Sequence, residues 1–333
     1  MKKCLVPVLI GVAATAATAQ SSVTLFGVVD LSLRTVKNGD VRNTGMAPDG
    51  YQTSRFGVRG VEDIGGGLKT IFWFESAVAP DTGNAGAGGK FWNRRSTVGL
   101  SGKFGEIHAG RDYSPSYWNL GIFDAFGNFG IGSALNMVST LGSGAATLVR
   151  TDSGFSYFTP SGLGGFYGHV RYAFGEGGVG KYTGARLGYR SGKLDAAVGY
   201  GQTDTTAADK FKVANAGISY DFGFVKPLFV YQRAEYGARK QVIMEIGAVV
   251  PVGLGEFHVA YASANASGAG TDANDAKLIA LNYGYFLSKR TTLYSSVARI
   301  RNSGKAAFSV GTRPAGVAGR NSTGFDVGIR HTF

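Results

Sequence analysis

The chain of 333 residues is poor in cysteine, proline and acidic side chains, and it has no long apolar run. Its one cysteine, Cys4, lies near the start. We expect residues 1–19 to be a cleaved export signal: Lys2–Lys3 precede an apolar stretch over 5–14, and Ala17–Ala19 forms an A-x-A cleavage site. A retained anchor helix is the alternative, but this stretch is too short to span a bilayer.

The mature chain, over residues 20–333, then has no cysteine, which excludes a disulfide-stabilised secreted domain. Export without disulfides is typical of a bacterial envelope protein. Lipidation is also disfavoured, because a lipoprotein cysteine lies at the cleavage site and Cys4 does not.

No stretch approaches 18 consecutive apolar residues, so no transmembrane helix is predicted. Proline is scarce, at 8 residues, whereas glycine is abundant, at 53, and aromatic residues reach 12%. The mean hydropathy is +0.01. A transmembrane barrel has such a balance, because lipid-facing and lumen-facing residues alternate along its strands.

Acidic residues are too few to balance the basic ones: 22 Asp and Glu against 34 Lys and Arg give a net charge of +12. No basic helix, RNA-binding motif or clustered Lys/Arg run is present, so nucleic acid is not an expected partner. In an envelope protein, the expected partners of this charge are lipopolysaccharide phosphates, small solutes and inorganic anions.

The C-terminal segment shows strict two-residue alternation. Its apolar row is Phe325, Val327, Ile329, His331 and Phe333, and the opposite row contains Asp326 and Arg330. This period predicts a strand with one apolar face. An arginine facing lipid at mid-membrane costs roughly 2–4 kcal/mol, so we expect Asp326 and Arg330 to face inward and the aromatic row to face lipid.

Similar alternation recurs along the chain, and short and long connections alternate between the segments. The clearest strand segments are 23–36, 51–62, 67–78, 194–200 and 256–261, and tight turns are predicted at 62–66, 102–105, 160–162, 190–193, 251–255 and 287–290. Longer connections are predicted at 37–50, 79–90, 113–147, 175–181, 203–210, 237–240, 263–275 and 302–322. Outer-membrane barrels have short periplasmic turns and long external loops.

These features predict an all-β fold: a transmembrane antiparallel β-barrel of about 16 strands. Closure removes the sheet edges, which is how strands satisfy their hydrogen bonds in lipid, and sixteen strands leave a water-filled interior. A soluble double sandwich is the alternative.

The segment 113–147 differs from the rest of the chain. It has no sustained period of 2 or 3.6, and about 35 irregular residues far exceed the usual loop length. It is too apolar to be a disordered linker, containing Tyr117, Trp118, Leu120, Ile122, Phe123, Phe126, Phe129 and Ile131. We therefore expect it to fold into the barrel lumen and narrow it.

Three stretches resemble the Gram-negative general porins common in beta-proteobacteria: residues 22–30, residues 54–69, which begin Ser-Arg-Phe-Gly-Val-Arg-Gly, and the ending Gly-Ile-Arg-His-Thr-Phe at 328–333. The turn at 287–291 is similar to one in that family. The resemblance implies a homotrimer in the outer membrane, with the third external loop folded inward. It also implies that Phe333 belongs to the signal that the barrel-assembly machinery binds.

The same resemblance implies a charged constriction. Its basic wall comprises Arg55 and Arg59, one of the pair Arg94 and Arg95, and Arg34. Strand alternation leaves only one of the pair facing the lumen, and we favour Arg94. Asp124 is the implied acid on the inward loop, whereas residues 127–130 lack the second acid of cation-selective members. The alternative is that these arginines pair with Glu75 or Asp112 as wall structure.

A narrow constriction of low dielectric focuses charge and concentrates the opposite ion. We therefore predict a water-filled channel for passive diffusion of small hydrophilic solutes and ions, with a preference for anions. The runner-up is a substrate-specific channel in which Tyr113, Tyr117 and Trp118 stack on a sugar or an organic acid.

A barrel enzyme is the third hypothesis, but the four histidines, at 108, 169, 258 and 331, lie on separate predicted strands. No catalytic constellation or metal-ligand spacing is found, so no catalytic residue, metal or cofactor is predicted. The G-x-G-x-x-G match at 175–180 joins two strands and opens no helix, which excludes phosphate cradling. The acidic turn at 271–275 is expected to be a solvated loop, with calcium binding as the alternative.

Overall fold

The computed structural model describes residues 21–86, 89–176, 180–205 and 209–333. The expected signal segment, residues 1–19, lies outside the described residues, as does part of the glycine-rich 175–180 stretch. None of the helices within the described ranges is long and apolar enough to cross a membrane.

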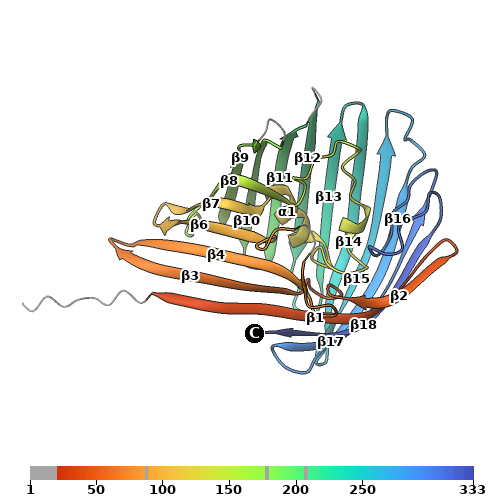
Figure 1. The fold of residues 1–333 in the computed structure, drawn as a ribbon, viewed down its shortest axis with the longest axis horizontal. Coiled ribbons are helices and arrows are strands. Elements are labelled where there is room, and N and C mark those ends of the chain that lie inside the picture. The colour runs from red at the N-terminus through yellow and green to blue at the C-terminus, as the bar shows by residue number, and fades with distance from the viewer. Residues whose placement is uncertain (1–20, 87–88, 177–179, 206–208) are drawn as a thin grey trace, which may run out of the picture.

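The described chain is an antiparallel sheet with two short helices (Figure 1). Its elements are β1 (Ser22–Asn38), β2 (Val41–Ala47), β3 (Arg55–Gly65), β4 (Leu68–Ala79), β5 (Asn84–Ala85), β6 (Arg95–Gly102), β7 (Gly105–Tyr113), α1 (Pro115–Phe123), η1 (Ala134–Met137), β8 (Arg150–Phe158), β9 (Phe166–Ala173), β10 (Tyr182–Ser191), β11 (Leu194–Asp204), β12 (Lys210–Tyr220), β13 (Lys226–Tyr236), β14 (Arg239–Val252), β15 (Gly255–Ser267), β16 (Ala276–Phe286), β17 (Thr291–Asn302) and β18 (Ser322–Thr332).

The first strand closes the barrel by pairing with the last. The β1–β18 register runs from Val28 opposite Thr332 to Asn38 opposite Ser322. On its other side, β1 pairs with β3 along its first half and with β2 along its second half. We therefore count β2 and β3 as one interrupted strand and β5 as part of a loop, which gives sixteen barrel strands. The predicted barrel is confirmed, and a sandwich is excluded.

The residue after β18 extends this closure. The Phe333 N–H donates to the carbonyl of Gly27 at 3.1 Å, and the Gly27 N–H donates to the carbonyl of Phe333 at 3.0 Å. A Cβ at Gly27 would lie 2.4 Å from the Phe333 ring, so the ring packs where position 27 has no side chain. The ring remains 46% exposed on the outer face.

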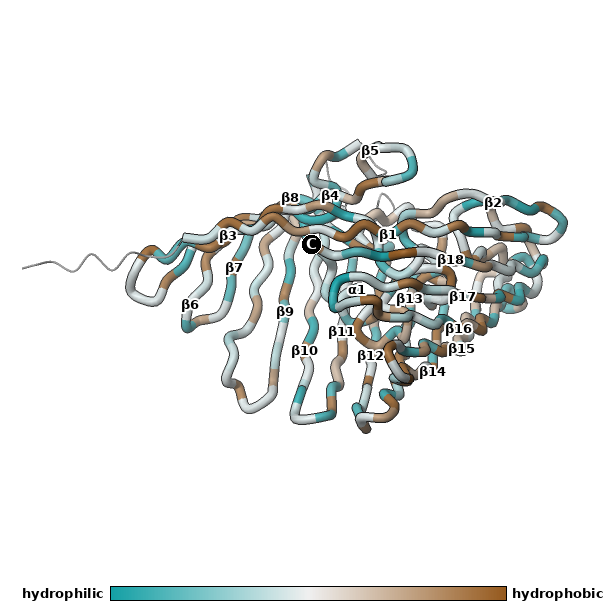
Figure 2. The backbone as a smooth tube through the Cα atoms, turned by 90° about the horizontal axis from the view of Figure 1, so that it is seen from below, coloured by the Kyte–Doolittle hydropathy of each residue, from teal (hydrophilic) through white to brown (hydrophobic). Residues whose placement is uncertain are grey.

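The outer face of the barrel is apolar, as the alternation predicted. Exposed large apolar side chains recur on alternate residues of the strands, among them Leu25, Leu33, Leu187, Val198, Ile246, Ile279, Phe325, Val327 and Ile329. On β18 the intervening Asp326 is fully buried, which confirms the predicted orientation of that strand. Figure 2 shows apolar and polar positions recurring along the strands, and the loop that contains β5 standing off from the barrel wall.

Two predicted loops are much shorter than expected. In the predicted loop 37–50, β1 continues to Asn38, turns at Gly39–Asp40 and returns as β2. In the predicted loop 237–240, only Gly237 and Ala238 separate β13 from β14. Both segments are polar, and at a hydrated barrel rim strands need no apolar face. Conversely, the tight turn predicted at 160–162 is a longer connection, because β8 ends at Phe158 and β9 begins at Phe166.

The interruption between β2 and β3 is a segment that turns into the barrel, residues 48–54, and it is held by Asp30. The buried Asp30 carboxylate accepts the backbone N–H groups of Gly50, Tyr51 and Gln52 at 3.2, 2.9 and 2.7 Å. The hydroxyl of Tyr294 donates to the same carboxylate at 2.5 Å. The Asp30 side chain of β1 therefore holds the middle of the 48–54 segment.

Apolar burial is concentrated inside the barrel, where the 113–147 loop packs. Ile131 and Met137 of this loop are fully buried in one cluster with Ile243, Leu278 and Ile300 of the wall. The loop and the 48–54 segment also meet: a Cβ on Gly130, whose φ is +65°, would lie 2.3 Å from the carbonyl oxygen of Gly50.

Replacing Asp30 by Asn is expected to destabilise the barrel. The asparagine amide has only one acceptor oxygen for the four donors that the carboxylate now accepts, and its NH₂ group would face some of them. A hydrogen bond to a charged group contributes about 1.5–3 kcal/mol. We expect the free energy of unfolding to fall by about 3 kcal/mol, measured by urea unfolding of the refolded protein. Asp63→Asn is the matched control, since Asp63 accepts only the exposed turn N–H of Gly65. Equal unfolding midpoints for the two variants would contradict this role of Asp30.

Candidate pore constriction

The 113–147 loop begins with a helix that local sequence specifies. Ser114 is the N-cap, its hydroxyl accepting the N–H of Tyr117 at 3.3 Å, and Pro115 occupies the first turn, where a missing N–H costs nothing. The helix α1 lies inside the curve of the sheet (Figures 1 and 2). The Asn119 amide donates to the carbonyl of Ala197 on β11 and to Asn215 on β12.

Glycine on the wall lets the helix approach closely. A Cβ on Gly217 of β12 would lie 2.1 Å from the Phe123 ring, which is fully buried. Further along the loop, the Gln241 amide of β14 donates to the carbonyl of Met137 at 2.9 Å, and its oxygen accepts the N–H of Ser139 at 2.9 Å. These contacts attach the loop along the inner face of β11–β14.

Asp124, the expected acid on the pore side of this loop, does not face the pore. Its carboxylate is 3% exposed and accepts the N–H groups of Phe126 and Asn128 and the hydroxyl of Ser133, at 2.7, 3.1 and 2.5 Å. The expectation is therefore wrong. The side chain turns into its own loop because the backbone N–H groups after α1 need an acceptor.

Burial raises the pKa of the Asp124 carboxyl above its ordinary value, and this effect outweighs the hydrogen bonds that favour the charged form. A raised folded-state pKa contributes stability at low pH, and that contribution is lost as the pH rises through the raised value.

A cavity of about 580 Å³ separates the loop from the opposite wall. The wall contributes Arg55, Arg94, Arg95, Trp73 and Glu75, and the loop contributes Tyr113, Tyr117, Trp118, Ile122 and Phe129. The structure thus brings most of the predicted site residues around one space. We call this space the central cavity.

Arg94 is the most constrained guanidinium of the central cavity. Its Nε donates to Glu75 Oε1 at 2.5 Å and its Nη2 donates to the Tyr113 hydroxyl at 2.7 Å. Glu75 also accepts the indole N–H of Trp73 at 3.1 Å. The single carboxylate of the cavity is therefore occupied by Arg94 and Trp73.

Arg150 was not predicted from the sequence, yet it joins this cluster. Its Nη2 donates to the Tyr113 hydroxyl at 2.8 Å, its Nε donates to the carbonyl of Arg94 at 2.9 Å, and its guanidinium lies 4.3 Å from the centre of the Tyr113 ring. Its position in the sequence could have indicated this role. Arg150 directly follows the inward loop, so it begins β8 beside Tyr113, the residue that ends β7.

Arg55 and Arg59 are less engaged by carboxylates. The Arg55 Nη1 donates to the carbonyl of Thr53 at 3.1 Å, and its Nε is 3.9 Å from Glu75. Arg59 forms no ion pair with any described residue, and its guanidinium lies 5.1 Å from the Trp73 ring and 5.4 Å from the Phe26 ring. Arg59 lines an adjoining cavity of about 410 Å³, which shares Trp73 and Arg95 with the central one.

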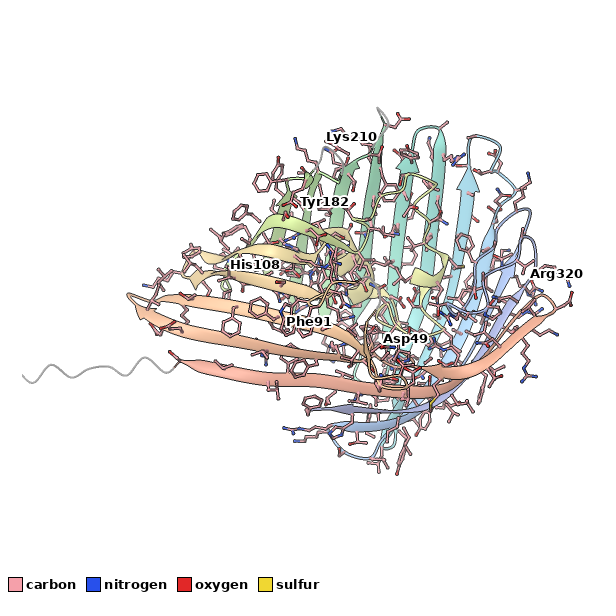
Figure 3. All side chains as sticks on the ribbon, in the orientation of Figure 1. Asp49, Phe91, His108, Tyr182, Lys210 and Arg320 are labelled. Atoms are coloured by element: carbon pink, nitrogen blue, oxygen red, sulfur yellow. The ribbon has the colours of Figure 1, made fainter. Side chains whose placement is uncertain are left out.

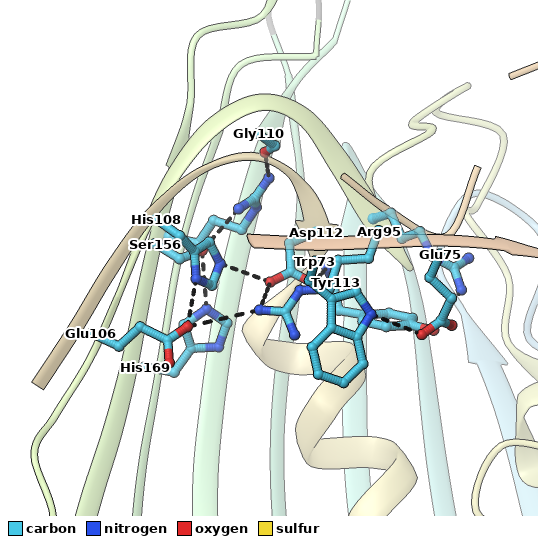
Figure 4. A network of polar contacts seen from close by, with 12 residues as sticks. Trp73, Glu75, Arg95, Glu106, His108, Gly110, Asp112, Tyr113, Ser156 and His169 are labelled. Carbon is cyan, nitrogen blue, oxygen red and sulfur yellow. Dashed lines mark hydrogen bonds and ion pairs between the residues drawn. The ribbon is translucent and has the colours of Figure 1, made fainter. Parts of the chain in front are cut away.

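The expectation that only one of Arg94 and Arg95 faces the lumen is wrong, because both line the central cavity. Arg94 precedes the first residue of β6, so strand alternation does not apply to it. The Arg95 guanidinium lies 4.7 Å from the Trp73 ring, and its Nη2 lies 3.4 Å from Asp112 and 3.9 Å from Glu106 (Figure 4).

Arg34 lies apart from this cluster. Its Nε and Nη2 donate to the two oxygens of Asp326 at 2.8 Å each, and its Nη1 lies 2.8 Å from Asp49, which Figure 3 labels. The register places Arg34 directly opposite Asp326 across the β1–β18 seam. Two carboxylates neutralise it, so its role is to join the ends of the barrel.

Two of the four histidines, His108 and His169, lie buried in a polar network. His108 contacts Glu106 and Asp112 at 2.8 and 2.9 Å, and His169 Nε2 lies 3.4 Å from Ser156 (Figure 4). The other nitrogen of His169 has no hydrogen-bond partner, so no acid orients it as a base for Ser156. Within the described ranges, no three side chains of His, Cys, Asp or Glu are placed to hold a metal ion.

Replacing Asp124 by Ala is expected to loosen the turn after α1. The N–H groups of Phe126 and Asn128 both lose a charged acceptor, and each lost hydrogen bond costs roughly 1.5 kcal/mol. If the turn opens as one unit, the two losses together should make its opening about 100-fold more frequent. Hydrogen exchange of these two amides measures this directly. Asp221→Ala is the matched control, because Asp221 accepts one exposed turn N–H, from Gly223. Unchanged protection of both loop amides would show that Asp124 does not hold the turn.

Comparison with known proteins agrees with this architecture. The family model of Gram-negative porins matches residues 6–305. Outer membrane porin protein 32 of Delftia acidovorans is 39% identical over 100% of both chains, and an outer membrane porin protein of Bordetella pertussis is 28% identical over 96% of each. The solved anion-selective porin from Comamonas acidovorans is 36% identical with a TM-score of 0.87, covering 94% of this chain and 100% of that chain. The chain therefore belongs to the Gram-negative porin family.

Proposed function

We infer that this outer-membrane porin prefers anions and that the arginines around the central cavity produce the preference. Small hydrophilic solutes diffuse through a water-filled barrel, which the 113–147 loop narrows. No catalytic step and no cofactor take part in this passage.

This proposal rests on the imbalance of charge around the central cavity. Arg55, Arg94 and Arg95 line it, and Arg150 reaches it through Tyr113, whereas Glu75 is the one carboxylate on the lining. Glu75 is already hydrogen-bonded to Arg94 and Trp73, and Asp124 is turned into its own loop. A passing ion is therefore exposed to an excess of positive charge, which low-dielectric walls focus.

The relatives support the same direction of selectivity. The solved structure that is 36% identical to this chain is described as an anion-selective porin. Guanidinium groups suit the task because they remain protonated at all physiological pH values.

The homotrimer remains part of the proposal, as do its partners in the membrane. Long connections gather at one end of the barrel, where they bring exposed cationic side chains such as Lys305 and Arg313, which form no ion pair with any described residue. These are suited to lipopolysaccharide phosphates. Phe333, exposed on the outer face at the barrel seam, is the proposed contact for the barrel-assembly machinery.

Replacing Arg55 by Gln should weaken anion preference. A unit charge about 5 Å from an ion's path is worth roughly 0.8 kcal/mol in water, attracting the anion and repelling the cation, so the anion-to-cation permeability ratio should fall about 16-fold. The reversal potential of the protein in a planar bilayer, across a potassium chloride gradient, measures this ratio. Arg233→Gln is the matched control, because Arg233 is exposed and paired with Glu235 on the same strand.

A neutral or cation-favouring reversal potential in the unmodified protein would sink the proposal. Equal shifts in the two variants would remove Arg55 from it. The same recordings test the oligomer, since a trimer gives conductance steps in groups of three.

A further inference from the structure

The central cavity has a feature that ion diffusion does not require: much of its lining is aromatic. Trp73, Tyr113, Tyr117, Trp118 and Phe129 all contribute to it. A wall that only attracts inorganic anions needs fixed charge and water, whereas cavities that hold organic ligands are apolar with a few placed polar groups. A volume of about 580 Å³ lies within the range of such sites.

Trp118 is the most exposed aromatic residue that the loop contributes to the central cavity. The Tyr113 ring is covered by the Arg150 guanidinium and stacks with Tyr117, with centroids 5.3 Å apart and an interplanar angle of 6°. The Trp118 side chain is 37% exposed, and its single ring contact among described residues is an edge-to-face one with Tyr113, at 5.4 Å and 70°. No described ring therefore stacks on a face of the Trp118 indole.

Arg55 is the guanidinium of the central cavity that is free to bind a solute. Arg94 is held by Glu75 and Tyr113, Arg150 by Tyr113 and the carbonyl of Arg94, and Arg95 faces Asp112. Arg55 uses Nη1 on the carbonyl of Thr53 and reaches no carboxylate closer than 3.9 Å. Its fork retains donors for the two oxygens of a carboxylate.

We propose that the central cavity is a binding site for aromatic monocarboxylates, with the ring against Trp118 and the carboxylate on Arg55. This inference rests on the proposed anion preference and specifies the organic solute class that the channel favours. A neutral sugar would leave Arg55 without a partner, and a small inorganic anion would leave the Trp118 face unused.

The test is blockade of single-channel chloride current by benzoate, with acetate as the probe of equal charge without a ring and benzamide as the neutral ring. Benzoate should reduce the current at concentrations at which acetate and benzamide have no effect. Trp118→Leu should raise the half-blocking benzoate concentration about fivefold, which corresponds to an aromatic contact of about 1 kcal/mol. Trp118→Phe keeps an aromatic face and should stay within about twofold of the unmodified protein.

The chloride reversal potential separates this inference from the proposed function. Trp118→Leu removes no charge, so it should shift this potential less than Arg55→Gln, which should also weaken benzoate blockade. Trp92→Leu is the control for loss of an indole, because Trp92 stacks on Phe74, on the outward row of β4. Equal blockade by benzoate and acetate, or blockade unaffected by Trp118→Leu, would overturn the proposal while leaving the anion preference intact.

Discussion

Closure of the sheet is the constraint on which the rest of this structure depends. An open strand edge in lipid leaves backbone groups without partners, at several kcal/mol each, so the first and last strands must meet. The chain achieves this with β1, which pairs with β18 on one side and with β2 and β3 in turn on the other. At this seam the Phe333 backbone pairs with Gly27, and Arg34 bridges to Asp326. Backbone pairing and a buried ion pair therefore secure the same junction.

Once the barrel is closed, every second strand residue faces the interior, and the chain fills part of this space with its own segments. The 113–147 loop covers β11–β14, and the 48–54 segment is held over β1 by Asp30. The two segments meet at Gly130 and Gly50, where the left-handed backbone at 130 and the lack of space for a Cβ both require glycine. The remaining wall carries the arginines of the central cavity, on β3, at the start of β6 and at the start of β8. The polar side of the pore is thus the side that the inward segments leave uncovered.

Features of the fold that depend on the two-residue period of the strands could be predicted from the sequence. The alternation of Phe325 to Phe333 predicted both strand and orientation, and the irregular 113–147 segment was recognisable because it breaks that period. Side-chain direction outside regular strands was not predictable. Asp124 was expected at the pore and instead accepts three loop donors, and Arg94 and Arg95 both reach the cavity because one of them precedes its strand. Arg150 and the 48–54 segment were missed because their positions depend on Tyr113 and Asp30, partners distant in sequence or in a different element.

The arginines around the pore fall into two kinds, and we propose that this division lets one site both attract and release a solute. Arg94 and Arg150 are fixed by Tyr113 and Glu75, so they supply a constant field without moving when an ion passes. Arg55 and Arg59 have no carboxylate within hydrogen-bonding distance among the described residues, so their charge is available to the solute. A channel must bind its solute strongly enough to admit it and weakly enough to let it leave. With Glu75 engaged by Arg94, the proposed balance rests on Arg55, where a solute carboxylate would replace water and water from the open lumen would later replace the carboxylate.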